Sequence, residues 1–177
     1  MKKIILIYGL IAGAIVSAMM FISMPLYKSG AITPDKGEVI GYTTMIIALS
    51  MVFFGIKSFR DNYQNGTITF AKGFKIGVLI TLIASVMYAL SWEVSYNRIG
   101  QEFTQKMSEH YFEKMKAKGA SETELQEAKQ KMKLYAEMYK NPVIRFGITL
   151  IEIFPIGLAL SLLSAGLLRR KEFLPAS

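Results

Sequence analysis

The stretch from Ile4 to Tyr27 reads IILIYGLIAGAIVSAMMFISMPLY, 24 residues without a formal charge. As an α-helix this run extends about 36 Å, which is enough to cross the hydrocarbon core of a bilayer. Lys2 and Lys3 precede it as in a signal peptide, but a signal peptide has a polar region around its cleavage site. Here the apolar run continues past the small triplet Ala12-Gly13-Ala14. The sequence therefore predicts an uncleaved first membrane helix.

Three further segments have the length and composition of membrane helices. Val39 to Ile56 contains 18 uncharged residues, and Ile76 to Trp92 contains 17. Phe146 to Leu168 contains 23 residues, with one acid and one proline among them. Aromatic residues four apart extend the third segment on one face, as in an interfacial aromatic belt. We predict an all-α integral membrane protein with four transmembrane helices, over about residues 4–27, 39–56, 74–96 and 146–168.

The composition limits the classes of function. The 177 residues are 52% hydrophobic and 19% charged, whereas soluble proteins average about 25% charged residues. The chain has no cysteine and one histidine, which excludes disulfides, thiolate ligands and His-rich metal clusters. The net charge of +8 fits basic residues at membrane surfaces and requires no nucleic acid. Because no catalytic motif is present either, we expect no enzymatic activity, metal or cofactor.

The basic residues predict an orientation in the membrane. Cytoplasmic segments carry an excess of Lys and Arg, so we place both termini in the cytoplasm and the four helices in the cell (inner) membrane. The segment between the third and fourth helices, outside in this arrangement, holds ten basic and eight acidic residues, but long segments translocate with little regard to charge. In this arrangement the two acidic residues inside are Asp61 and Glu172. The nine basic residues inside are Lys2, Lys3, Lys57, Arg60, Lys72, Lys75, Arg169, Arg170 and Lys171.

The connection between the second and third helices has strong local signals. Asn65-Gly66 is a turn pair, and Thr69 is placed to cap a third helix that begins at Phe70. The four basic residues around this connection have aliphatic stems that can lie along the membrane while the charges reach lipid head groups. Phosphate binding by the same connection is the alternative. The candidate head-group contacts are Lys57, Arg60, Lys72 and Lys75.

The segment from Glu93 to Arg145 predicts a helical hairpin outside the membrane, at residues 97–141. Its first helix covers about Gly100 to Lys118, and a capping box at Ser121 to Glu124 opens the second. Asn141-Pro142 ends the second helix. We expect one apolar stripe (Phe103, Met107, Tyr111, Met115) to pack against another (Leu125, Met132, Tyr135, Tyr139).

The alternative reading of this hairpin is a surface for a membrane or extracytoplasmic protein partner. His110 lies beside the first stripe and is interpreted as a surface or half-buried residue, not as a ligand. Rows of small residues four apart occur in the membrane segments, at Gly9 and Gly13, at Gly73 and Gly77, and at Gly157, Ser161 and Ala165. Such rows allow helices to approach closely in lipid, either within one chain or between copies in a homo-oligomer.

Glu152 is the one formal charge well inside a predicted membrane segment. A charge in hydrocarbon costs on the order of 3 kcal/mol on insertion scales, so the carboxyl group should be protonated, paired or hydrated. We favour a structural role, with Glu152 facing the helix bundle and accepting a hydrogen bond. The alternative is a proton or cation site beside Pro155, which can bend the helix.

The chain resembles a bacterial membrane family catalogued as domain of unknown function 4199, over nearly its whole length. The resemblance implies a small multi-pass membrane protein and transfers no activity, cofactor or catalytic residue. It rests on the Gly9/Gly13 helix, Gly41-Tyr42-Thr43-Thr44-Met45, the run from Phe53 to Asp61, Asn65-Gly66-Thr67-Ile68-Thr69-Phe70, Gly73-Phe74, Glu152 with Gly157, and Ser164-Ala165-Gly166 before Arg169-Arg170.

Two hypotheses for the function follow from the sequence. The first is a non-catalytic accessory or scaffold protein whose hairpin meets a partner. The second is a small transporter or ion-conducting oligomer that uses Glu152. Both place the chain in a lipid bilayer.

Overall fold

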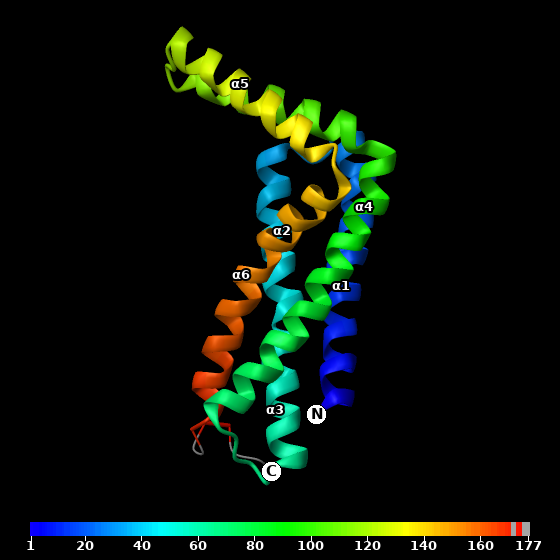
Figure 1. The fold of residues 1–177 in the computed structure, drawn as a ribbon, viewed down its shortest axis with the longest axis vertical. Coiled ribbons are helices and arrows are strands. Elements are labelled where there is room, and N and C mark those ends of the chain that lie inside the picture. The colour runs from blue at the N-terminus through cyan, green and yellow to red at the C-terminus, as the bar shows by residue number, and fades with distance from the viewer. Residues whose placement is uncertain (171–172, 175–177) are drawn as a thin grey trace. The chain divides into compact units, whose positions relative to one another are not determined.

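The computed structural model describes residues 1–170 and 173–174, except for the side chain of Gln101. Lys171 and Glu172, which contribute to the predicted orientation, lie outside the described residues. All regular structure in the described part is α-helical (Figure 1). The helices are α1 (Lys2–Lys28), α2 (Pro34–Leu49), α3 (Met51–Tyr63), α4 (Phe70–Ala117), α5 (Glu122–Tyr139) and α6 (Pro142–Leu168).

Four segments are long and apolar enough to cross a membrane, as predicted: Lys2–Lys28, Pro34–Tyr63, Phe70–Gly100 and Pro142–Leu168. Each is longer than its uncharged core because helix formation continues into the polar flanks. Pro34 occupies a first-turn position of α2, where its missing N–H group costs nothing. Thr69 caps α4 by accepting a hydrogen bond at 3.3 Å from the Lys72 backbone N–H, so α4 begins at Phe70 as predicted.

The second span consists of two helices that meet at Ser50, where the sequence predicted one. The Ser50 hydroxyl donates to the Ile47 carbonyl at 2.6 Å, and its backbone N–H is shared between the carbonyls of Ile46 and Ile47. A serine that bonds back to the preceding turn competes with the helical ladder and bends the helix. Together α2 and α3 still cover the length of one span.

Helix α4 continues without a break from the third span into the first half of the hairpin. Gly100 is the one glycine between Trp92 and Phe103, and an isolated glycine costs only about 1 kcal/mol. The helix ends at Ala117, and the chain turns at Gly119, which has φ +80°. The Gly119 and Ala120 N–H groups bond the Lys116 and Met115 carbonyls in a Schellman motif. The predicted capping box at Ser121 then opens α5.

The described residues form two compact units. The bundle comprises residues 1–91 and the described residues from 149 onward, and the hairpin unit comprises Trp92–Ile148. The hairpin unit contains the second half of α4, all of α5 and the first residues of α6. Each unit has its own packing.

Glycines place the helices of the bundle in close contact. A Cβ atom at Gly157 of α6 would lie 2.2 Å from Thr81 Cγ2 of α4, and one at Gly77 would lie 2.7 Å from Ser161 Oγ. On the other side of α4, a Cβ atom at Gly13 of α1 would lie 2.4 Å from Met87 Sδ. All of these distances are shorter than real Cβ contacts. The small-residue rows thus pack helices within one chain.

Candidate functional site

An ion pair between Glu93 of α4 and Arg145 of α6 lies at the base of the hairpin unit. Arg145 Nε donates to Glu93 Oε1 at 2.9 Å, and Nη2 donates to Oε2 at 2.5 Å. The third donor, Nη1, bonds the Tyr139 carbonyl at 2.9 Å. The Arg145 side chain is 5% exposed and that of Glu93 is 21% exposed. The two-bond geometry fixes both side chains, as expected for a planar guanidinium facing a carboxylate.

Aromatic side chains surround this ion pair. The Arg145 guanidinium lies 3.9 Å from the centroid of the Tyr96 ring, which meets the Tyr139 ring edge to face at 5.5 Å. Trp92 Nε1 donates to the Tyr139 hydroxyl at 2.8 Å. Trp92, Tyr96 and Tyr139 therefore hold the surroundings of this ion pair in place.

This pair was not predicted from the sequence. The one available signal was that Glu93 and Arg145 are the charged residues that bound the long segment between the third and fourth spans. An open groove of about 1420 Å³ lies beside the pair. Its walls carry both signs of charge, with Arg98 and Lys140 near Glu93 and Glu102. Within the described residues no group of three His, Cys, Asp or Glu side chains could hold a metal ion.

The predicted seam of the hairpin is only partly correct. Phe103 and Met115 are half-buried, as are Leu125, Met132 and Tyr139. Met107, Tyr111 and Tyr135 are exposed instead. Each step of four residues turns 40° beyond one full turn of the helix. Four residues spaced in this way therefore cannot all face the same straight neighbouring helix. The side of α4 that faces α5 carries Thr104 and Ser108 instead. The Ser108 hydroxyl contacts Met132 Sδ of α5 at 3.9 Å.

An apolar surface therefore remains on the outside of the hairpin. Tyr111 and Tyr135 line one pocket of about 640 Å³ between α4 and α5. Met107 lies four residues before Tyr111, and Met138 lies three residues after Tyr135. We define the hairpin apolar surface as five exposed residues: Met107, Tyr111, Leu134, Tyr135 and Met138.

Glu152 does not face the bundle, so that part of our structural interpretation is wrong. Its neighbours Thr149 and Ile153 are buried, at 2% and 0% exposure, whereas Glu152 is exposed. The inward face of α6 is therefore the one that carries Thr149 and Ile153. Among residues 1–170 and 173–174, no hydrogen-bond or ion-pair partner of the Glu152 carboxyl group is present.

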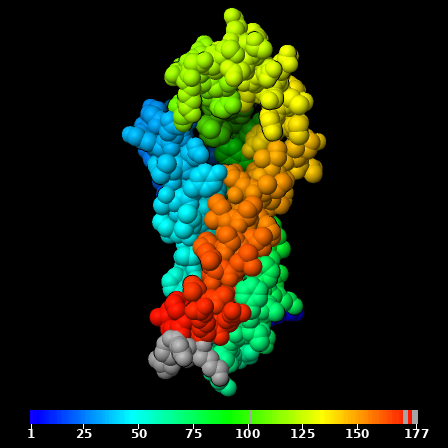
Figure 2. All heavy atoms as spheres, turned by 90° about the vertical axis from the view of Figure 1, so that its left-hand side faces the viewer, coloured from blue at the N-terminus to red at the C-terminus, as the bar shows by residue number. Residues whose placement is uncertain are grey.

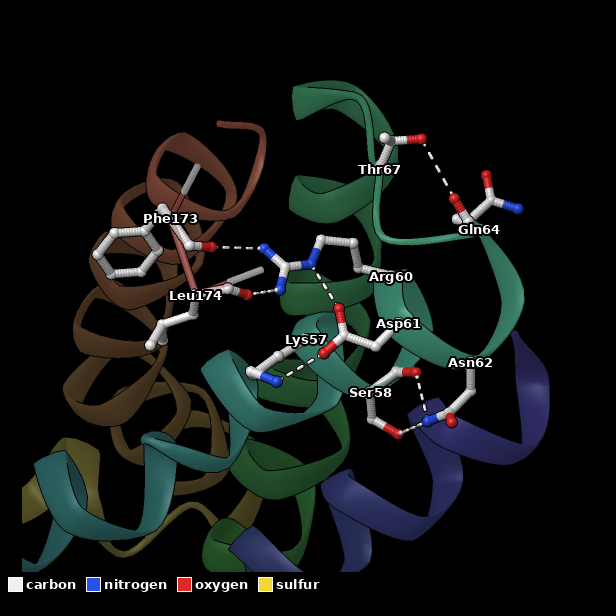
Figure 3. Close-up of polar contacts among 9 residues, drawn as sticks. All are labelled: Lys57, Ser58, Arg60, Asp61, Asn62, Gln64, Thr67, Phe173 and Leu174. Atoms are coloured by element: carbon white, nitrogen blue, oxygen red, sulfur yellow. Dashed lines mark hydrogen bonds and ion pairs between the residues drawn. The ribbon is translucent and has the colours of Figure 1, made fainter. Parts of the chain in front are cut away.

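Arg60 is not available as a head-group contact, because its side chain is fully buried. Figure 3 shows its guanidinium pointing toward the chain after α6. Nε donates to Asp61 Oδ1 at 2.7 Å, Nη1 donates to the Phe173 carbonyl at 2.9 Å, and Nη2 donates to the Leu174 carbonyl. The sequence placed Arg60 correctly at the end of a span but could not show which way it turns.

The other three predicted head-group residues differ in their surroundings. Lys57 Nζ bonds Asp61 Oδ2 at 2.6 Å, so Asp61 joins two basic residues (Figure 3). Lys72 is exposed, bonds Gln64 Oε1 at 2.9 Å and lies 6.0 Å from the Phe59 ring centroid. Lys75 is exposed as well. Lipid contact by these lysines stays a prediction.

A family model described as "Protein of unknown function (DUF4199)" matches residues 7–170. The match covers the first span from residue 7, the other three spans and the whole hairpin, in agreement with the resemblance stated from the sequence. No curated protein and no solved structure matches the chain.

Proposed function

The chain belongs to the DUF4199 family of proteins of unknown function, and from this premise we propose that it is a non-catalytic accessory or scaffold protein of the bacterial inner membrane. In this proposal the hairpin apolar surface binds a partner protein outside the bilayer.

The observation that carries the proposal is where the exposed apolar side chains lie. Large apolar residues on the outside of the four spans contact lipid tails, which surround a membrane helix. The five residues of the hairpin apolar surface lie outside all four spans. Exposed apolar patches outside the membrane mark surfaces for protein partners.

The chemistry of the hairpin apolar surface also resembles a protein interface. Its two tyrosines and two methionines belong to residue types enriched in the centre of interfaces. Charged side chains of both signs line the same pocket as Tyr111 and Tyr135, namely Lys118, Glu124, Glu127 and Lys131. An apolar centre with a charged rim supports a partner that is itself a folded protein with a mixed surface.

Photocrosslinking in native membranes tests the proposal. A photoreactive residue at Tyr135 is compared with one at Lys133, an exposed position on another face of α5. We expect one discrete protein adduct from position 135, absent from position 133 and lost when Tyr111→Ser is added. Adducts of equal yield from both positions, or none from 135, would refute the docking surface.

The predicted orientation has its own test, because the chain has no native cysteine. Single cysteines replace Ser121 in the hairpin unit and Thr67 in the connection before α4. With an impermeant thiol reagent on intact cells, permeabilised at any outer membrane, we expect labelling at position 121 and protection at position 67. The opposite pattern would place the hairpin in the cytoplasm.

The alternative function, a small transporter or ion-conducting oligomer, is favoured by one observation. Glu152 lies in a span, and its carboxyl group has no partner among the described residues. Proton flux into liposomes containing the purified chain would support this function if Glu152→Gln abolished it, since an amide does not exchange a proton near neutral pH. Flux equal to that of empty liposomes would exclude a proton pathway.

A further inference from the structure

The outward face of α6 carries an acid in a position where the chain offers it no partner. In Figure 2, α6 is the orange-to-red helix, and it lies at the surface beside α2 without another helix in front of it. Glu152 is exposed, as are Pro155 and Ala159, and the helical spacing puts all three on one side of α6, which we call its outward face. Ile151 and Leu163 flank the face, at 73% and 62% exposure.

Four other polar side chains of the bundle have hydrogen-bond partners within the chain, in contrast to Glu152. Thr81 and Ser161 are fully buried and lie 3.4 Å apart, and Ser161 also bonds the Gly157 carbonyl at 2.7 Å. Ser91 bonds Ser17 at 2.8 Å between α4 and α1. These hydroxyl groups point into the bundle, where they find partners. Hydrocarbon offers no partner to Glu152, and ionisable residues in spans rarely face lipid.

The same face is shaped for close approach of another helix. Pro155, Ala159 and Gly166 follow Glu152 at spacings of three, four and seven residues, which is the repeat of a left-handed helix pair. A Cβ atom at Gly166 would meet nothing within 4 Å, unlike one at Gly157. The bundle therefore uses Gly157 for its own packing and leaves Gly166 open.

We propose that this face of α6 binds the same face of a second copy of the chain, with the two Glu152 carboxyl groups hydrogen-bonded to each other. A two-fold axis along the bilayer normal places identical residues at identical depth. Each carboxyl group then meets a group that can both donate and accept when protonated. A different partner would have to present a matching polar group at that same depth. This dimer does not depend on the hairpin apolar surface.

Disulfide crosslinking in liposomes tests the contact. Ala159→Cys lies on the proposed interface, and Ile47→Cys lies on the exposed side of α2. We expect rapid formation of covalent dimer from Ala159→Cys and little from Ile47→Cys. Equal crosslinking of the two variants would overturn the proposal, as would crosslinking of Ala159→Cys in native membranes to another protein without self-adduct.

The role of the acid is measured by dimer dissociation, followed by energy transfer as the protein is diluted in lipid. Glu152→Gln retains a donor and an acceptor, so we expect dimerisation to persist. Glu152→Leu should weaken the dimer about 5- to 30-fold, the range for an interhelical hydrogen bond of about 1–2 kcal/mol in membranes. Gly166→Leu should weaken it by blocking close approach while keeping the carboxyl group. Unchanged dissociation in both leucine variants would refute the interface.

Discussion

The bundle and the hairpin unit expose apolar side chains to a similar degree, and the same exposure means different things in the two. Val39 and Ile22 in the spans are 67% and 60% exposed, while Leu134 and Tyr135 in the hairpin are 63% and 61% exposed. In the spans the bilayer covers such residues. In the hairpin nothing in the described chain does. Exposure thus becomes evidence about function only once the surrounding solvent is known.

The two units are also held together by different interactions. The bundle relies on glycines that let helices touch, with hydroxyl groups bonded between them. The hairpin unit relies on one partly buried ion pair, on the aromatic side chains around it, and on the hydrogen bonds that end α4 near Gly119 and begin α5 at Ser121. Substitutions should therefore destabilise one unit without affecting the other.

The largest expected effect is on the hairpin unit, from breaking the Glu93–Arg145 pair. Arg145→Met leaves the half-buried carboxylate of Glu93 without its partner. Breaking a fully buried pair costs about 3–5 kcal/mol, and we expect a loss at the lower end of that range because Glu93 is partly exposed. Hydrogen exchange should show faster opening across residues 92–148 while the rates in α1 remain unchanged. The double variant Glu93→Leu/Arg145→Met should recover much of the loss, because both charges are removed together. A double variant as unstable as the sum of the single variants would show that the pair is not coupled.

The next effect is on the bundle and distinguishes two glycines of the same helix. Gly157→Ala should destabilise the bundle by about 1–3 kcal/mol, because the β-branched side chain of Thr81 occupies the space that the new methyl group needs. Gly166→Ala should leave stability unchanged, since that site is open. Unfolding of the monomer in detergent provides the comparison. Equal effects of the two substitutions would contradict the α4–α6 contact.

A smaller effect is expected at the start of α5. Ser121→Ala removes the hydroxyl that accepts a hydrogen bond at 3.3 Å from the Glu124 backbone N–H, and loss of such a cap costs about 1 kcal/mol. Hydrogen exchange of the first turn of α5 should accelerate, with no change in the bundle. Acceleration in α1 or α2 would show that the two units do not unfold independently.

The capping box also predicts a dependence on pH. Two hydrogen bonds from Ser121 hold the pKa of the Glu124 carboxyl group below its ordinary value. The bond from the backbone N–H has the larger effect, and the bond from the hydroxyl has the smaller. Because the pKa of Glu124 is lower in the folded state, its ionised carboxylate stabilises the folded hairpin unit. This stabilisation is complete above the unfolded-state pKa and is lost as the pH falls through the folded-state pKa. Carboxyl NMR titration should show the Glu124 pKa rising toward its ordinary value in Ser121→Ala. The pKa of Glu137, lowered by its hydrogen bond from Lys140, should not move.

Features that depend on local sequence could be predicted. Uncharged runs located the four spans because only apolar side chains can face lipid along a whole helix. The Schellman glycine Gly119, the capping box at Ser121 and the cap at Thr69 depend on neighbours within a few residues, so the sequence contains all of their determinants. The hairpin between the third and fourth spans followed from the same local signals.

Features that depend on how helices turn could not be predicted. Glu152, Arg60 and Tyr135 all lie on the predicted helices, but their direction depends on which face each helix presents to its neighbours. A rotation by one residue, 100°, moves a side chain from the interior to the surface. The Glu93–Arg145 pair joins residues 52 apart in sequence, and no local pattern links them.

The most direct test of the central claim asks whether the hairpin apolar surface faces water. Single cysteines at Tyr135 and at Ile47, each carrying a spin label in the otherwise cysteine-free chain, are compared in liposomes by collision with oxygen and with a water-soluble nickel complex. We predict that the nickel complex dominates at position 135 and that oxygen, which partitions into lipid, dominates at position 47. Oxygen dominating at both positions would contradict the account, because lipid would then cover the hairpin apolar surface and leave no site for a protein partner.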